Sequence, residues 1–290
     1  MNFYSIKYFV LTNINNFLMR LGKISSSKRV RNPIELDRKK VLSKVSEIIE
    51  NQHGIPTVTI ITPTTGSKHL KKAVESIQNQ NYKDILHLIV VDGEHNWNNV
   101  QKTINQLNAP NVKVIILPYN TGKNGMNGHR IYASMPYLIN SEYIGFLDED
   151  NWYEANHLET LIELITKFNL DWSYSMRNIF TEDGDFVIGD NCESIGDYKP
   201  ISNQNKLIDT NCYLIKRNEL LKSTQYWYHP LKADRYFFHH LKKNSPSFRS
   251  TKKFTVNYRL KNDKPLYPDF FINGNEVMLK KFNHKLPWLV

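Results

Sequence analysis

The sequence predicts an α/β fold with a Rossmann-like, mostly parallel sheet flanked by helices, preceded by an N-terminal helical extension. Two observations carry this prediction. Short apolar or β-branched segments alternate with helical patterns in units of about 30 residues, which is typical of a doubly wound sheet. These segments also end in turn-forming or acidic residues, and ligands of open α/β sheets bind beyond the carboxyl ends of the strands. With 290 residues, the chain suffices for one large domain of this kind or two small ones.

The alternation is regular over residues 53–151. Each predicted strand is rich in Val, Ile or Leu, and Pro, Gly, Asn or Asp flank it, as expected at strand ends. Apolar residues at helical spacing separate the strands. We predict strands over 57–62, 85–91, 112–117 and 143–147, and helices over 68–78, 98–107 and 129–139.

Residues 152–260 continue the same domain with less regular spacing, which is typical of an acceptor-binding subdomain built on a nucleotide-binding half. Residues 261–290 form a basic C-terminal segment in which we predict no element. A turn at 182–185 precedes a short strand. The other predicted elements of this half are helices over 154–168 and 234–241 and strands over 171–180, 207–216 and 253–259.

The first 52 residues form the N-terminal extension. Apolar residues follow nearly helical spacing over 3–21, and a second helix is predicted over 35–50. Polar residues interrupt every window of about 20 residues, which argues against a transmembrane helix, and no signal-peptide pattern is present. Residues 1–34 hold six basic residues and no acidic one. A helix on an anionic membrane, on the protein's own surface or on a partner each fits this pattern.

Composition and charge limit the class of protein. The net charge of +10 is uneven, because residues 242–290 hold eleven basic and three acidic residues while the middle of the chain is acidic. Basic ends around an acidic centre are unlike a nucleic-acid groove, so we expect no nucleic acid partner. Two distant cysteines, Cys192 and Cys212, argue against a zinc site or a disulfide framework. They fit a reducing compartment, so we expect a cytoplasmic protein. Of the alternatives for the N-terminal helix, contact with anionic lipid would place it peripherally on the inner face of the cell membrane.

The most informative segment is 141–151, Ser-Glu-Tyr-Ile-Gly-Phe-Leu-Asp-Glu-Asp-Asn. Its apolar part is the strand predicted over 143–147, and three acidic residues, Asp148, Glu149 and Asp150, follow at once. Residues two apart in an extended chain project to the same side, so Asp148 and Asp150 form a pair of carboxylates. Such a pair suits a hard divalent cation, which in turn binds diphosphates. The alternative is a solvated turn that ends a strand.

Four elements in order resemble the family 2 glycosyltransferases of GT-A fold, and the resemblance covers about residues 56–260. Each element alone is common, but the four in this order are specific. The first strand ends in Thr62-Pro63-Thr64 and the second in Val90-Val91-Asp92-Gly93. An Asn120-Thr121-Gly122 segment leads to a helix that begins with His129-Arg130, and Leu147-Asp148-Glu149-Asp150 matches the acidic DxD element.

The resemblance implies a nucleotide-sugar site at the ends of the first two strands. The turn of Thr62, Pro63 and Thr64, together with Asp92 and Gly93, would hold the base. Asp92 would accept a hydrogen bond from a uracil-like N–H, which selects one base edge. The alternative for Asp92 is an ordinary Asp-Gly turn.

The resemblance also implies how the phosphates and the metal are bound. Arg130 would approach the nucleotide or its phosphates with its bidentate guanidinium, unless it forms a plain surface ion pair. Asp148 and Glu149 would contact the nucleotide sugar, and Asp148 and Asp150 would bind Mn²⁺ or Mg²⁺. The ion would neutralise the charge that develops on the departing nucleoside diphosphate.

Inverting members of this family use an acidic residue near the start of a late helix as the general base for the acceptor hydroxyl. The corresponding residue here is Asp234. Ala233 departs from the family pattern, in which an acid often stands at that position. A helix N-cap is the competing interpretation of Asp234. Asp209 and Trp152 are the residues expected on the acceptor side, Trp152 through stacking on a sugar face.

These expectations combine into one function: a metal-dependent inverting glycosyltransferase. It would move a sugar from a nucleotide sugar, expected to be UDP-linked, to a glycan or lipid-linked glycan in surface polysaccharide synthesis. One alternative is a sugar-nucleotide nucleotidyltransferase, although the turn after the first strand has one glycine and no Arg. The other is a non-catalytic module that binds sugar nucleotides or glycans.

Overall fold

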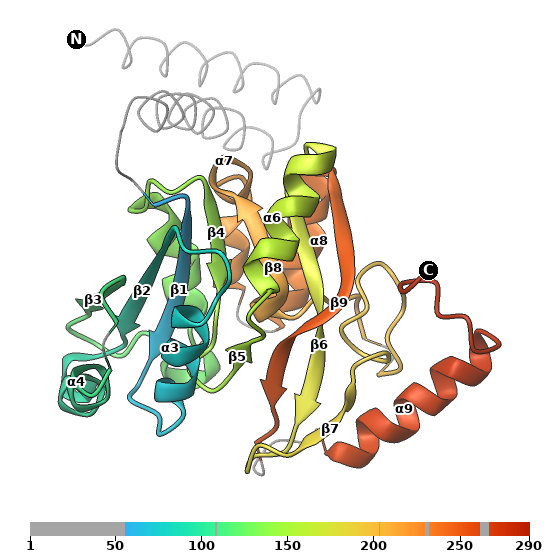
Figure 1. Ribbon diagram of the computed structural model, residues 1–290, viewed down its shortest axis with the longest axis horizontal. Helices are drawn as coiled ribbons and strands as arrows, with labels where there is room; N and C mark the ends of the chain where they lie inside the picture. The colour runs from blue at the N-terminus through green and yellow to red at the C-terminus, as the bar shows by residue number, and fades with distance from the viewer. Residues whose placement is uncertain (1–55, 108, 203, 230–231, 262–266) are drawn as a thin grey trace, which may run out of the picture. The chain divides into compact units, whose positions relative to one another are not determined.

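The structure, a computed structural model, describes residues 56–290 except 108, 203, 230–231 and 262–266 (Figure 1). The chain divides into two compact units, Met1–His53 and Gly54–Val290, and the described residues belong to the second. The N-terminal extension predicted over 1–52 therefore lies outside the described residues. Within the described ranges, no helix has the length and apolar character needed to span a bilayer.

Four parallel strands form the regular half of the sheet, in the order β3-β2-β1-β4 (Figure 1). Thr64 pairs with Val91, and the Leu147 N–H donates to Ile61 O at 3.0 Å, so β1, β2 and β4 end at one edge. The acidic residues after β2 and β4 consequently meet at this edge. Each strand overlaps its predicted range: β1 (Val58–Thr64), β2 (Ile85–Val91), β3 (Val112–Ile116) and β4 (Tyr143–Phe146).

The helices between these strands confirm the predicted alternation. They are α3 (Leu70–Gln78), α4 (Trp97–Asn105) and α5 (His129–Ser134). The last is shorter than predicted, because Pro136 interrupts it and a 3₁₀ turn, η3 (Met135–Tyr137), follows.

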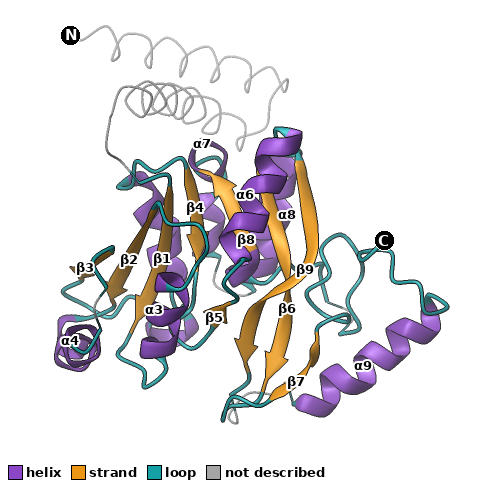
Figure 2. Ribbon diagram, viewed as in Figure 1, coloured by secondary structure: helices purple, strands orange, loops and turns teal. Residues whose placement is uncertain are grey.

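The second half extends the sheet to nine strands in the described part of the chain, with mixed strand directions (Figure 2). β8 (Tyr213–Lys216) is antiparallel to β4 and to β6 (Trp172–Phe180), and β9 (Phe248–Arg259) is parallel to β6. β5 (Trp152–Tyr153) pairs with β9 and β7 (Phe186–Gly189) with β6, both antiparallel. The predicted α/β fold is confirmed, and its all-parallel part is the first half. The helices here are α6 (His157–Phe168), α7 (Arg217–Leu220) and α8 (Ala233–Asn244).

Two segments differ from the prediction. Of the strand predicted over 207–216, only β8 forms, because Asp209 caps a 3₁₀ turn, η4 (Thr210–Cys212). The C-terminal segment contains a helix that was not predicted, α9 (Pro268–Lys281). Asn and Gly in its centre lower the helix propensity. Gly274 nevertheless allows close packing, since a Cβ there would lie 2.8 Å from the Cys192 sulfur.

An aromatic cluster joins the two halves behind the end of β4. The Trp227 ring stacks on Phe237 at 4.3 Å between centroids and lies 5.5 Å from Tyr132 and 5.9 Å from Phe146. All four side chains are buried. Burial of each contributes about 1.5–3 kcal/mol. The cluster fixes α5 and the start of α8 against the strand that leads to Asp148.

Candidate active site

A cavity of about 510 Å³ opens at the edge where β1, β2 and β4 end. The rest of its wall comes from the loop after β3, from α5 and from the end of β9, and includes His129, Tyr132, Arg259 and Lys261. Six predicted site residues line it together: Pro63, Thr64, Asp92, Asp148, Glu149 and Asp150.

Asp92 holds the loop that follows β3. Its carboxylate accepts from the N–H groups of Thr121 at 2.6 Å and Gly122 at 2.8 Å. Arg130 is exposed and donates to Thr121 O at 3.1 Å, so it fastens the same loop from outside. The buried amide oxygen of Asn120, also on the cavity wall, has no hydrogen-bond partner in the structure. It is available to a donor on a bound base.

Glu149 organises the turn after β1. Its carboxylate accepts from the Thr64 hydroxyl at 2.5 Å, from the Thr65 hydroxyl at 3.0 Å, and from the backbone N–H groups of Thr65 at 3.2 Å and Ser67 at 2.8 Å. These bonds join the ends of β1 and β4. Glu149 therefore shapes one wall of the cavity through the turn that it holds.

We expect Glu149→Gln to lower the free energy of unfolding by about 1–3 kcal/mol, because an amide offers one acceptor oxygen where four donors converge. Urea unfolding of the two proteins measures this loss. Glu94→Gln is the control, because Glu94 is exposed and follows β2 at the same edge. Equal losses in the two variants would contradict the role given to Glu149.

Asp148 is held by residues from both halves of the chain. Tyr132 donates its hydroxyl to the carboxylate at 2.6 Å, and the Asn211 side chain donates at 3.0 Å. The backbone N–H of Asp148 donates to the Asn211 side-chain oxygen at 2.6 Å. Burial, followed by the neighbouring charge of Asp150, raises the pKa of Asp148 to about 6.

Asp150 lies at the same wall and faces two cationic side chains. The Lys261 ammonium lies 2.6 Å from its carboxylate, and the Arg259 guanidinium donates to its backbone carbonyl at 3.2 Å. Burial lowers the pKa of Lys261, but the charge of Asp150 outweighs this effect and the net shift is upward. Lys261 is therefore a full cation beside the acidic residues.

The carboxylates of Asp148 and Asp150 suit a divalent ion that is bound jointly by the protein and by the phosphates of a substrate. The described residues contain no cluster of three or more His, Cys, Asp or Glu side chains suited to a metal. Mg²⁺, however, is commonly held by one or two carboxylates together with substrate phosphates. Asp150 and Asp148 line one cavity and supply such carboxylates, although Asp150 must exchange Lys261 for the ion.

Asp234 lies in the first turn of α8 and is not among the residues that line the cavity. It is half-buried, and its carboxylate accepts from the N–H of Arg235 at 2.8 Å. The same helix reaches the cavity wall through Trp227, which stacks on Phe237 at 4.3 Å and on the lining residue His129 at 5.7 Å. Burial lowers the pKa of His129, and the charge of Asp234 opposes this effect.

Arg130 and Asp234 are not among the residues that line the cavity, and four other predicted residues are also absent from its wall. Thr62 is buried and its hydroxyl is 2.9 Å from the His87 ring. Gly93 has a φ of 104°, which suits glycine, and starts the turn before α4. Trp152 is buried, with the Lys72 ammonium 3.5 Å from its ring centre.

Asp209, the fourth, is buried and forms an ion pair of 2.5 Å with Arg177. Its carboxylate also accepts from the side chain of Asn211 at 2.7 Å. Because Asn211 in turn donates to Asp148, Asp209 supports Asp148 through Asn211.

The sequence prediction did not include Tyr132, Asn211 or Lys261. Tyr132 could have been predicted, because it lies one helical turn after His129, which belongs to the family pattern, and so projects from the same face of the helix. No such pattern pointed to Asn211, in the turn before β8, or to Lys261, just after β9. Their proximity to the acidic residues depends on how β8 and β9 join the sheet.

The chain has recognisable relatives. The sequence profile of glycosyl transferase family 2 matches residues 59–212. Glycosyltransferase GlyA of Streptococcus pneumoniae is 26% identical over 134 residues, which are 43% of this chain and 17% of that protein. The GalNAc(5)-diNAcBac-PP-undecaprenol beta-1,3-glucosyltransferase of Campylobacter jejuni is 26% identical over 129 residues, 44% of this chain and 40% of that protein. The matched part is thus 17 to 40% of the length of the curated relatives.

Among solved structures, S. aureus TarS 1–349 in complex with UDP-GlcNAc is similar, with a TM-score of 0.52 and 16% identity. The match covers 80% of this chain and 68% of that one. At this identity the likeness concerns the fold, and it confirms the predicted GT-A fold.

Proposed function

The chain belongs to glycosyl transferase family 2, and on this premise we propose that it transfers a sugar from a nucleotide sugar to a hydroxyl group of a glycan. The observation that carries the proposal is the convergence of Asp92, Asp148, Glu149 and Asp150 on one cavity with Arg259 and Lys261. A nucleoside diphosphate needs polar groups for its base and cationic groups for its phosphates, and this cavity offers both.

The donor would lie with its base against the loop held by Asp92, where Asn120 offers an unpaired acceptor oxygen. Its diphosphate would lie near Asp150, Arg259 and Lys261. A UDP-linked donor is the expected class, because the similar TarS structure contains UDP-GlcNAc. A Mn²⁺ or Mg²⁺ ion held by Asp148 and Asp150 would neutralise negative charge on the leaving diphosphate.

Transfer with inversion needs a base for the acceptor. The acceptor oxygen attacks the anomeric carbon, the bond from that carbon to the diphosphate oxygen breaks, and the acceptor proton passes to the base. We assign the base to Asp234, in the first turn of α8, whose charge acts on the lining residue His129. Asp209 and Trp152, being buried, would support the acceptor side through packing.

A lipid-linked glycan is the proposed acceptor. The Campylobacter jejuni relative is named for an undecaprenol-linked substrate, which supports this class. The proposed setting is surface polysaccharide synthesis on the cytoplasmic side of a membrane. The N-terminal extension, outside the described residues, would contribute to membrane attachment.

A thermal-shift panel of UDP, GDP, CDP and their sugars, each with and without Mn²⁺, tests the donor class. We expect a Mn²⁺-dependent stabilisation by the uridine compounds alone. Analysis of the products formed from a nucleotide sugar and a lipid-linked glycan extract separates the alternatives. Release of nucleoside diphosphate indicates sugar transfer, and release of pyrophosphate indicates a nucleotidyltransferase. Binding without turnover would indicate a non-catalytic module.

Metal-dependent donor binding is expected to weaken as the pH falls through about 6. The raised pKa means that Asp148 is protonated below this value, and a carboxyl group must be ionised to hold a cation. Titration of UDP and Mn²⁺ by calorimetry between pH 5 and 8 measures the effect. Asp148→Asn should bind more weakly at every pH and lose this dependence. A flat profile in the unmodified protein would contradict the assignment.

A further inference from the structure

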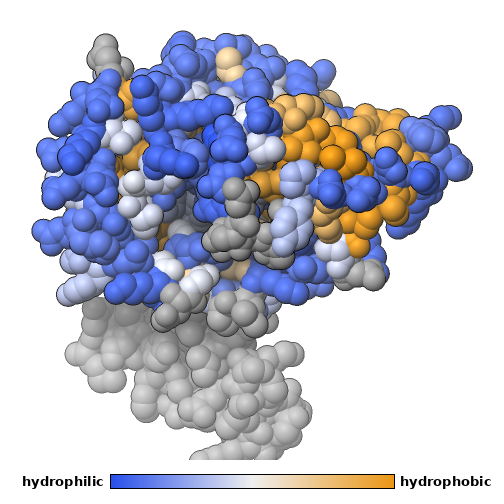
Figure 3. All heavy atoms as spheres, turned by 90° about the horizontal axis from the view of Figure 1, so that it is seen from below, coloured by the Kyte–Doolittle hydropathy of each residue, from blue (hydrophilic) through white to orange (hydrophobic). Residues whose placement is uncertain are grey.

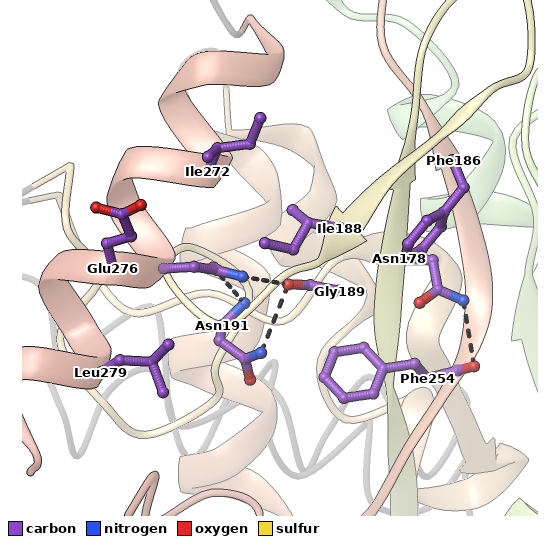
Figure 4. A pocket seen from close by; sticks show the side chains of 10 residues that line it. Asn178, Phe186, Ile188, Gly189, Asn191, Phe254, Ile272, Glu276 and Leu279 are labelled. Atoms are coloured by element: carbon purple, nitrogen blue, oxygen red, sulfur yellow. Dashed lines mark hydrogen bonds between the residues drawn. The ribbon is translucent and has the colours of Figure 1, made fainter. Parts of the chain in front are cut away.

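A second cavity, of about 500 Å³, lies between α9 and the strands β6, β7 and β9 (Figure 4). Ile272 and Leu279 project from α9 toward Ile188 and Phe254 on the opposite wall, and Phe186 stands at its edge (Figure 4). We call these five side chains the α9 surface. Much of it faces solvent, since Phe186 is 61% exposed and Ile272 is 38% exposed.

The amide groups on the floor of this cavity are occupied by internal hydrogen bonds. Asn275 donates to Gly189 O at 2.6 Å and accepts from the Asn191 N–H at 3.0 Å. The Asn191 side-chain oxygen accepts from the Trp288 ring at 2.9 Å. Glu276 is the carboxylate of the lining, and it is exposed. The rest of the lining is apolar or consists of hydrogen-bonded amides, so the cavity is better suited to hydrocarbon than to a glycan.

Four lysines are close in sequence to residues of the α9 surface. Lys253 precedes Phe254, and Lys280 and Lys281 follow Leu279 in the last turn of α9, with Lys285 just beyond. All four are exposed, and none pairs with a carboxylate of the described residues. These four lysines outnumber Asp269 and Glu276, the exposed acidic residues of α9. An exposed apolar surface with a net excess of basic side chains complements the surface of an anionic bilayer.

The α9 surface and the active-site cavity face the same side of the molecule. β1 and β4 end at the lower side of Figure 1, which is the side seen in Figure 3. The apolar residues over β7 and α9 gather on this side (Figure 3). A bilayer against the α9 surface would therefore lie on the side of the molecule where the cavity opens.

We propose that the α9 surface docks on an anionic lipid bilayer, with Phe186 and Ile272 entering the hydrocarbon boundary. This attachment site is distinct from the N-terminal extension. It deepens the proposed function, on which its purpose rests, because a lipid-linked acceptor presents its glycan at such a bilayer. Vesicle binding needs no turnover, however, so the docking can fail or hold whether or not the protein transfers sugar.

The test places an environment-sensitive NBD label on Ile272→Cys in the full-length protein. Cys192 and Cys212 are fully buried, and burial raises the pKa of both thiols, so the engineered thiol reacts selectively. We expect NBD emission to rise about twofold and shift to the blue with vesicles of phosphatidylcholine and phosphatidylglycerol. Leu138→Cys is the matched site, because Leu138 is 71% exposed and precedes β4, at the opposite end of the sheet.

A second measurement uses vesicle flotation. Phe186→Ser with Ile272→Ser should reduce binding about tenfold, whereas Leu138→Ser should leave it unchanged. Unchanged emission at position 272 on vesicles that do bind the protein would overturn the proposal, as would equal binding to neutral vesicles. Dimers that dissociate in the double variant, without vesicle binding, would instead identify a second copy of the chain as the occupant.

Discussion

Asp234→Asn is expected to reduce the rate of sugar transfer about 100- to 10,000-fold, the range typical for loss of a general base. An amide cannot accept the acceptor proton, yet it keeps the size of the side chain. Donor affinity should change by less than about twofold, since Asp234 is not among the residues that line the cavity. Steady-state kinetics gives the loss in kcat, and calorimetry with UDP gives the affinity.

The competing interpretation of Asp234 is a helix cap, and the control addresses it. Its carboxylate bonds to the N–H of Arg235, the next residue, so its capping contribution is small and Asn preserves it. Asp269→Asn, in the first turn of α9, is the matched change at another helix start. Retained transfer in Asp234→Asn would remove it from the base role. A large loss in His129→Gln would then point to the neighbouring imidazole.

The acidic segment shows how far sequence reasoning reaches. The strand, its end and the convergence with Asp92 could be predicted, because parallel strands end at one edge of a sheet. The different roles of the three consecutive acidic residues, Asp148, Glu149 and Asp150, could not be predicted. Tyr132 and Asn211 bind Asp148, the turn after β1 binds Glu149, and Lys261 forms an ion pair with Asp150. Each partner is distant in sequence and is brought close only by the completed sheet.

The second half was predicted less well for a related reason. Its strands run in both directions. Asp209, which was expected to contact the acceptor, forms a buried ion pair with Arg177. A buried ion pair has no signature in a single sequence, since an exposed Asp and Arg have the same letters. α9 escaped prediction because its packing on Cys192 through Gly274 overrides weak helix propensity.

Asp150→Asn is expected to lower kcat/KM about 100- to 1,000-fold, the cost of removing one electrostatic group from a leaving-group site. It should also abolish the effect of Mn²⁺ on donor binding, because Asp150 is the carboxylate that a cation already occupies: Lys261 lies 2.6 Å from it. Thermal shifts with UDP, with and without Mn²⁺, measure this dependence. Asp185→Asn, at an exposed turn residue, is the control.

Lys261→Met separates the two roles of that lysine. If the ammonium competes with the metal for Asp150, its removal should tighten binding of Mn²⁺ alone. If it also meets the diphosphate, the same variant should bind UDP more weakly in the absence of metal. Electron paramagnetic resonance of free Mn²⁺ reports the first effect and calorimetry the second. Undiminished Mn²⁺ dependence in Asp150→Asn, with unchanged Mn²⁺ affinity in Lys261→Met, would place the metal elsewhere and leave Asp150 as a structural partner of Lys261.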